Sequence, residues 1–147
     1  DTAWRNGLAS KLGFSQRTAD VDQLGEDFLH LLQTTGADFT NSFRALMNQS
    51  LSPDSFAPWL ELWRNLIEKQ PGGMPTALER MAKANPFVIP RNHLVQAALD
   101  AAEQGDDQPF ESLYAVLQKP FDIKHEGTTY AAPPPADATP YVTYCGT

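Results

Sequence analysis

The chain has 147 residues, 41% of them hydrophobic, and a net charge of −7. These values predict one soluble globular domain, because no apolar run approaches the roughly 20 residues that cross a bilayer and nothing at the start resembles a signal peptide. The acidic surface argues against nucleic acid as a partner, and the single cysteine rules out an internal disulfide framework and favours a reducing compartment.

Apolar residues recur every three or four positions through most of the chain, which predicts an all-α fold. A first helix is expected to end at Gly13, and no residue at its start is a good cap. A second helix is predicted from the cap Asp20 to Gly36. The apolar stripes are Trp4, Leu8 and Leu12 in the first helix and Val21, Leu24, Phe28, Leu31 and Leu32 in the second.

Asp38 is the expected cap of a third helix, and Ser52 or Ser55 that of a fourth. Pro58 fits the fourth helix only if that helix starts near Ser55, because proline is tolerated in a first turn. A fifth, short helix is opened by Pro75 in "PTALERMAKAN". The expected buried faces are Phe39, Phe43, Leu46 and Met47 in the third helix and Phe56, Trp59, Leu60, Trp63, Leu66 and Ile67 in the fourth.

Two more helices follow the loop "NPFVIPRN", which is expected to be extended because Pro86 and Pro90 disfavour helix in the residues before them. The sixth helix has a narrow, alanine-rich stripe and ends at Gly105. Asp106 or Asp107 can cap the seventh. The inward residues are expected to be Leu94, Val95, Ala98, Leu99 and Ala102 in the sixth helix and Phe110, Leu113, Tyr114 and Leu117 in the seventh.

The helical pattern ends at Lys119. We therefore expect residues 1–119 to form an irregular bundle of six or seven helices, with no strand and no internal repeat. Residues 120–147 hold five of the twelve prolines and are expected to form an extended tail. This tail carries the single cysteine, Cys145.

The motifs of common enzymes are missing from the sequence. It has no glycine-rich phosphate loop, no GxSxG, no HExxH and no cysteine and histidine cluster with metal spacing. We therefore predict no catalytic, cofactor-binding or metal-binding residue in this chain. The tryptophans fall at helical spacing and are assigned to the core in preference to a ligand groove. The three histidines, isolated in sequence, are His30, His93 and His125.

One ordered series of segments is more specific. "NPFVIPRNHLVQAALDAAEQGDDQPFESLYAVLQKPFD", followed by a tyrosine, "AAPPP" and a terminal thiol, resembles the C-terminal region of the selenoprotein O family. "LASKLGF" and "ADFTNSFRAL" are similar to segments of that family in the same order. The resemblance covers nearly the whole chain.

The resemblance implies that the chain is a fragment. Members of this family have a protein-kinase-like domain that binds ATP with magnesium and transfers AMP to hydroxyl side chains of proteins. That domain precedes the region similar to this chain, and its nucleotide-binding and metal-binding residues have no counterpart here. The implied parent is a protein adenylyltransferase whose partners are its own kinase-like domain and its protein substrates. The chain alone is expected to be inactive, and the uncapped start of the first helix agrees with a cut.

The resemblance also implies a role for Cys145. Animal members carry selenocysteine third from the end and many bacterial members carry cysteine there, which matches this position. Some members have a second thiol where this chain has Val142. A redox-sensitive Cys145 would therefore pair with a cysteine of the missing part or of another protein. The expected location is the bacterial cytoplasm.

Other interpretations stay open. Arg91 and Asn92 are candidates for contact with the catalytic domain, or they satisfy backbone groups around the double-proline loop. Eight of the 18 acidic residues but only two of the 11 basic ones lie from Asp100 onward. This asymmetry permits a free-standing helical adaptor that binds a basic protein through residues 100–126. A thiol enzyme using Cys145 is disfavoured because no basic residue close in sequence would lower the thiol pKa.

Overall fold

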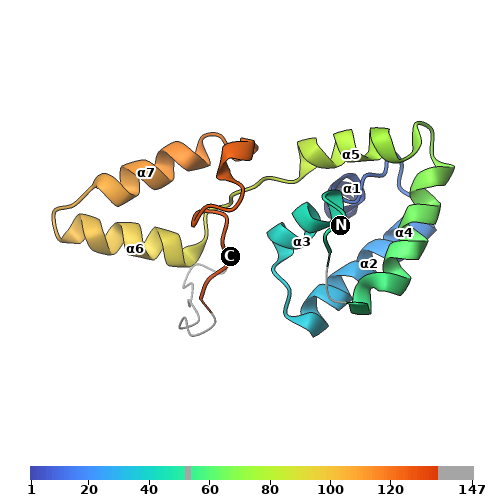
Figure 1. Ribbon diagram of the computed structural model, residues 1–147, viewed down its shortest axis with the longest axis horizontal. Helices are drawn as coiled ribbons and strands as arrows, with labels where there is room; N and C mark the ends of the chain where they lie inside the picture. The colour runs from blue at the N-terminus through green and yellow to red at the C-terminus, as the bar shows by residue number, and fades with distance from the viewer. Residues whose placement is uncertain (52–53, 136–147) are drawn as a thin grey trace. The chain divides into compact units, whose positions relative to one another are not determined.

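The computed structural model describes residues 1–51 and 54–135. Their regular structure is entirely helical, which confirms the predicted all-α class (Figure 1). None of the described helices is long and apolar enough to cross a membrane. The α-helices are α1 (Thr2–Lys11), α2 (Ala19–Thr35), α3 (Phe39–Met47), α4 (Ala57–Lys69), α5 (Gly73–Ala84), α6 (Asn92–Glu103) and α7 (Gln108–Leu117), and the short 3-10 helices are η1 (Asp54–Phe56) and η2 (Ile123–His125).

The chain divides into two compact units after Pro86. The first unit contains α1 to α5, and the second begins at Phe87 and contains α6 and α7. This division differs from the boundary at residue 119 that the loss of helical periodicity suggests. It falls in the double-proline loop, which is not helical. The backbone is extended at Asn85 and Arg91 and bends at Phe87.

The core of the first unit is aromatic. Phe28 is fully buried, and the ring of Trp59 stacks on it at a centroid distance of 4.5 Å. Trp63 stacks in turn on Trp59 at 6.2 Å. These contacts confirm the assignment of both tryptophans to the core, whereas Trp4 is half exposed and does not belong to it. The other rings packed on Phe28 are Phe43 and Phe56.

The starts of the first two helices differ from prediction. Asp1 caps α1, because its carboxylate accepts a hydrogen bond from the backbone N–H of Ala3 at 2.9 Å. The expectation of an uncapped helix, and the argument for a cut that rested on it, are therefore wrong. Thr18 caps α2 through the N–H of Val21, and Asp20 lies in the first turn instead.

The next two helix starts follow prediction more closely. Asp38 caps α3 by accepting from the N–H of Asn41 at 2.9 Å. Pro58 lies in the first turn of α4, as expected, but no side chain caps that helix. Ser55 lies within η1, and Ser52 lies outside the described residues.

Side chains from α4, from Gln70 directly after it and from α5 hold the turn that follows α1. Gly13 has φ +91°, a backbone conformation that glycine adopts without strain, and α1 ends just before it as predicted. Its carbonyl accepts hydrogen bonds from Gln70 Nε2 at 2.8 Å and from an Arg80 guanidinium nitrogen at 2.9 Å. The indole of Trp63 donates to the neighbouring carbonyl of Leu12 at 2.9 Å. Residues distant in sequence therefore fix this turn.

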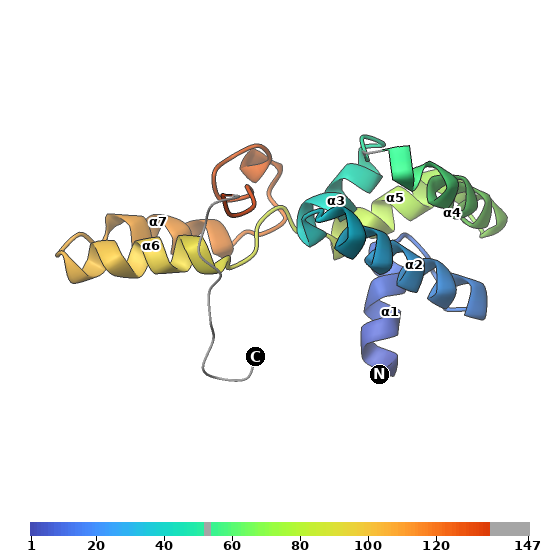
Figure 2. The ribbon, with the colours of Figure 1, turned by 90° about the horizontal axis from the view of Figure 1, so that it is seen from below.

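The second unit is built on a helical hairpin. Helices α6 and α7 lie side by side in both views, joined by the short connection 104–107 (Figures 1 and 2). The hairpin buries Ala98 and Leu113. Leu99, Phe110 and Tyr114 were expected to face inward but are 45%, 47% and 59% exposed. A two-helix hairpin cannot enclose apolar residues on more than one side of each helix.

Residues 120–131 fold onto the start of the same unit. The N–H of Phe87 donates to the carbonyl of Pro120 at 2.8 Å, and Phe87, Val88 and Ala131 form a small buried cluster. The expectation of an extended tail from residue 120 is therefore wrong as far as Ala131. Residues 133–135 have no regular structure, and residues 136–147 lie outside the described part of the chain.

Candidate functional site

Arg91 and Asn92, the candidates for an interdomain contact, lie at the start of α6. The Arg91 side chain is buried, and its guanidinium donates to the carbonyl of Ala131 at 3.5 Å. Asn92 is the first residue of α6 and is exposed. Arg91 thus donates a hydrogen bond to a backbone carbonyl within its own unit. The alternative interpretation expected such a carbonyl in the double-proline loop, but this one lies forty positions along the chain.

Cys145 and Val142 lie outside the described residues. The redox role of this thiol therefore stays a prediction.

A polar cluster closes the C-terminal end of α5. Lys11 Nζ donates to the carbonyl of Ala84 at 3.0 Å, and the Arg44 guanidinium donates to the carbonyl of Asn85 at 3.2 Å. Cations at the last carbonyls of a helix are favoured by the helix dipole. The side chain of Asn85 is fully buried and donates in turn to the carbonyls of Lys11 and Met81 at 2.9 and 3.0 Å. The cluster therefore joins the ends of α1, α3 and α5.

The pKa of Lys11 in this cluster is shifted. Burial lowers the pKa of its ammonium group below the ordinary value, because the charged form loses hydration. The ammonium nitrogen also lies 5.9 and 5.6 Å from the ring centres of Phe39 and Phe43, and such contacts favour the charged form. The ammonium group of Lys11 thus contacts a carbonyl and two aromatic rings. These contacts favour a role in packing the first unit over a role in proton transfer.

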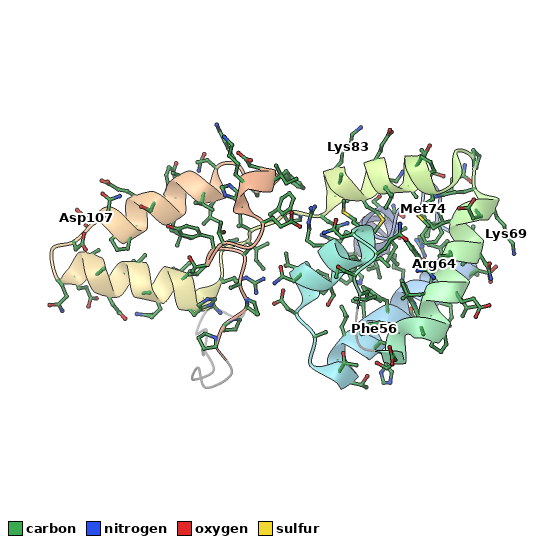
Figure 3. All side chains as sticks on the ribbon, viewed as in Figure 1. Phe56, Arg64, Lys69, Met74, Lys83 and Asp107 are labelled. Atoms are coloured by element: carbon green, nitrogen blue, oxygen red, sulfur yellow. The ribbon has the colours of Figure 1, made fainter. Side chains whose placement is uncertain are left out.

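Two adjoining hollows lie between the start of α2 and the end of α4. Their volumes are about 400 and 330 Å³, and both are lined by Asp20, Leu66 and Lys69. Lys69 lies at the C-terminal end of α4 (Figure 3). Volumes of this size suit small ligands, but neither lining contains a histidine or a cysteine among the described residues.

The described residues contain no metal-binding constellation. Across residues 1–51 and 54–135, no group of three or more His, Cys, Asp or Glu comes close enough to hold a metal ion. The residues present therefore do not fit the magnesium and ATP site that the family resemblance implies for the parent protein.

One surface of the second unit mixes aromatic and acidic side chains. Asp107, Phe110, Glu111 and Tyr114 recur at i, i+3, i+4 and i+7, so they share one side of α7, which we call the outward face. All four are exposed, and Asp107 lies at the turn of the hairpin (Figure 3).

Sequence reasoning missed this face because it assigned both aromatic residues to the core. A signal was present, since a second stripe on the same helix offers a better inward face. That stripe consists of Pro109, Ser112, Leu113, Val116 and Leu117, all buried or half-buried.

Comparison with known proteins adds a family relationship. A family model described as "Protein adenylyltransferase SelO" matches residues 1–118. The protein nucleotidyltransferase YdiU of Alkaliphilus metalliredigens is 40% identical over an alignment of 151 positions. This alignment covers 98% of this chain and 31% of that relative. The YdiU proteins of Sphingopyxis alaskensis and Rhodococcus jostii are each 39% identical, over 99% and 100% of this chain and 32% and 30% of their own lengths. The chain thus spans about a third of the length of these curated relatives.

Proposed function

The chain belongs to the SelO protein adenylyltransferase family, and from this we propose that it is the C-terminal helical region of an enzyme that transfers AMP from ATP to protein hydroxyl groups. The observation that carries the proposal is the family match over residues 1–118, which includes α1 to α7. The relatives are named as protein nucleotidyltransferases and are about three times as long as this chain. The activity would therefore belong to the longer protein.

The nucleotide site of the enzyme would lie in a kinase-like domain outside this chain. Adenylyl transfer needs cations and metal ligands placed around the phosphates. The described residues bring together no metal-binding group, and the sequence has no glycine-rich phosphate loop. Both observations favour a structural role for this chain, in which it binds neither ATP nor magnesium itself.

The small core of the second unit supports this structural role. In its described part, only five apolar residues are buried. A unit of this size with so few buried apolar groups gains little stability from its own core. Phe121 and Ile123, which follow α7, are 49% and 69% exposed and could pack against a larger domain. The five buried residues are Phe87, Val88, Ala98, Leu113 and Ala131.

The proposed function includes a redox-sensitive thiol at Cys145. Because this is the only cysteine of the chain, its disulfide partner would lie outside the chain, and the partner that we propose is a cysteine of the kinase-like domain. The two thiols would lose two protons and two electrons to a small disulfide such as oxidised glutathione, which is reduced to two thiols. The bond would limit activity or substrate access.

Calorimetry and labelled AMP transfer test the catalytic part of the proposal. We expect the 147-residue chain to give no saturable heat with ATP and magnesium, and the full-length protein to transfer AMP. In the full-length protein, Phe121→Ser with Ile123→Ser should lower the melting temperature and the activity. Leu62→Ser, at a residue of the first unit that is 56% exposed, is the matched control. Micromolar binding of ATP by the chain would show that the nucleotide site is misplaced.

Mass spectrometry tests the thiol. After oxidation and non-reducing digestion of the full-length protein, the peptide that contains Cys145 should be found linked to a second cysteine peptide. Oxidation should lower the activity of the wild type but not that of Cys145→Ser. A Cys145 peptide found only as free thiol, together with equal redox responses of the two proteins, would exclude the redox role.

A further inference from the structure

We propose that the outward face of α7 binds a basic segment of a partner protein. Cationic side chains of that segment would stack on Phe110 and Tyr114 and form ion pairs with Asp107 and Glu111. The inference goes beyond the proposed function and does not depend on it, because the binding is independent of nucleotide and of catalysis.

The geometry of α7 excludes a core role for these two rings. Leu113 is the buried residue of the helix and lies on the side that packs against α6. Phe110 and Tyr114 lie one helical turn apart and are 47% and 59% exposed. The solvent side of a surface helix is ordinarily polar, so two exposed aromatic rings on it call for a partner that covers them.

The charge around this face selects a cationic partner. The ion pairs of Arg5 and Arg17 with Asp22 and Glu26 lie in the first unit, and no acid of the hairpin takes part in them. Asp100 and Asp106 accept hydrogen bonds from a neutral amide and a backbone N–H, which leave their charges unpaired. Seven acidic and three basic residues lie between positions 87 and 135. The acidic residues of the hairpin are Asp100, Glu103, Asp106, Asp107 and Glu111.

Aromatic and carboxylate groups on one face match the chemistry of arginine. A planar guanidinium can stack on an aromatic ring and at the same time donate to a carboxylate. Both pairs, Asp107 with Glu111 and Phe110 with Tyr114, repeat after four residues, which corresponds to about 6 Å along the helix. Basic side chains one helical turn apart, or two residues apart in an extended chain, have a similar spacing. Nucleic acids and anionic lipids would be repelled by the same carboxylates.

A labelled peptide tests the proposal on the 147-residue chain. The probe is a fluorescein-labelled peptide of alanine and glutamine with arginines at positions 3, 7 and 10. We expect saturable binding by fluorescence anisotropy at low salt, and weaker binding as salt is added. The aromatic variant, Phe110→Ala with Tyr114→Ala, should weaken binding at least fivefold. The charge variant, Asp107→Asn with Glu111→Gln, should do the same.

Matched controls separate a specific face from general attraction. Glu61→Gln with Glu68→Gln removes two exposed charges from α4 and should change the affinity by less than twofold. Phe110→Tyr with Tyr114→Phe keeps both rings and should retain binding. Circular dichroism confirms that each variant is folded, and the same peptide with glutamine in place of arginine should not bind.

Three results would overturn the proposal. The first is equal binding by the wild type and the aromatic variant. The second is an equal loss in the charge variant and in the α4 control, which would indicate attraction without a defined site. The third is the absence of peptide binding to the full-length protein, which would show that another part of the same protein covers this face.

Discussion

Replacing Trp63 by phenylalanine tests how the first unit holds the end of α1. The indole Nε1–H of Trp63 donates to the carbonyl of Leu12 at 2.9 Å. Leu12 is fully buried and follows the last residue of α1, so its carbonyl has no partner within the helix. Among the described residues, the indole is the only hydrogen-bond donor to this carbonyl.

Trp59 provides the matched comparison. Its indole donates to the carbonyl of Leu24 at the same distance of 2.9 Å. Leu24 lies inside α2, where its carbonyl also accepts from the N–H four residues later. Trp59→Phe therefore removes a hydrogen bond but leaves no buried carbonyl without a donor.

The two substitutions should differ in cost. Removing the extra ring atoms costs about 1 kcal/mol in each case. Leaving the Leu12 carbonyl buried without a donor adds about 1 to 3 kcal/mol, whereas the Leu24 carbonyl keeps a partner and adds about 0.5 kcal/mol. We expect a loss in the free energy of unfolding of about 2 to 4 kcal/mol for Trp63→Phe and about 1 to 2 kcal/mol for Trp59→Phe.

Urea unfolding followed by tryptophan fluorescence measures this difference, since all three tryptophans lie in the first unit. Trp4→Phe, at a half-exposed position, is the control and should change the free energy of unfolding by less than about 0.5 kcal/mol. Equal losses for Trp59→Phe and Trp63→Phe would refute the reasoning about the buried carbonyl.

Two further predictions concern the turns and charges of the first unit. Gly13→Ala should lower the free energy of unfolding by about 2 to 3 kcal/mol, because φ is +91° and the new Cβ would lie 3.1 Å from that of Ala77. Gly36→Ala, with φ +68° and open space, should cost about 1 kcal/mol, and equal costs in thermal melts would contradict the packing contribution. The hydrogen bond from Arg17 holds the pKa of Asp22 below its ordinary value of 3.8. The wild type should therefore melt at a higher temperature than Asp22→Asn above pH 4. This difference should disappear as the pH falls through the pKa of Asp22 in the folded state. A difference in melting temperature that stays unchanged down to pH 2 would contradict this role of the Asp22 carboxylate.

The candidate sites were only partly accessible to sequence reasoning. The double-proline loop drew attention to Arg91, but its hydrogen-bond partner is the carbonyl of Ala131, which no local pattern identifies. The outward face of α7 was present in the sequence as an i, i+3, i+4, i+7 series. It was overlooked because Phe110 and Tyr114 were counted as core.

The sequence by itself determined the helices and several of their ends. Apolar residues at a period of 3.6 mark a helix wherever one side must be buried, and this requirement is local. The ends of α1 and α2 at Gly13 and Gly36 were predictable for a similar reason. Both glycines have positive φ, a conformation that other residues adopt only at a cost.

Only the tertiary structure decided which side of a helix is buried and which distant groups meet. Helix α7 has apolar residues on two sides, and its neighbour α6 covers the side of Leu113 and leaves Tyr114 exposed. The bond from Trp63 to Leu12 joins residues 51 positions apart. Burial and such bonds depend on where another part of the chain lies, and the spacing of residues along one helix does not contain that information.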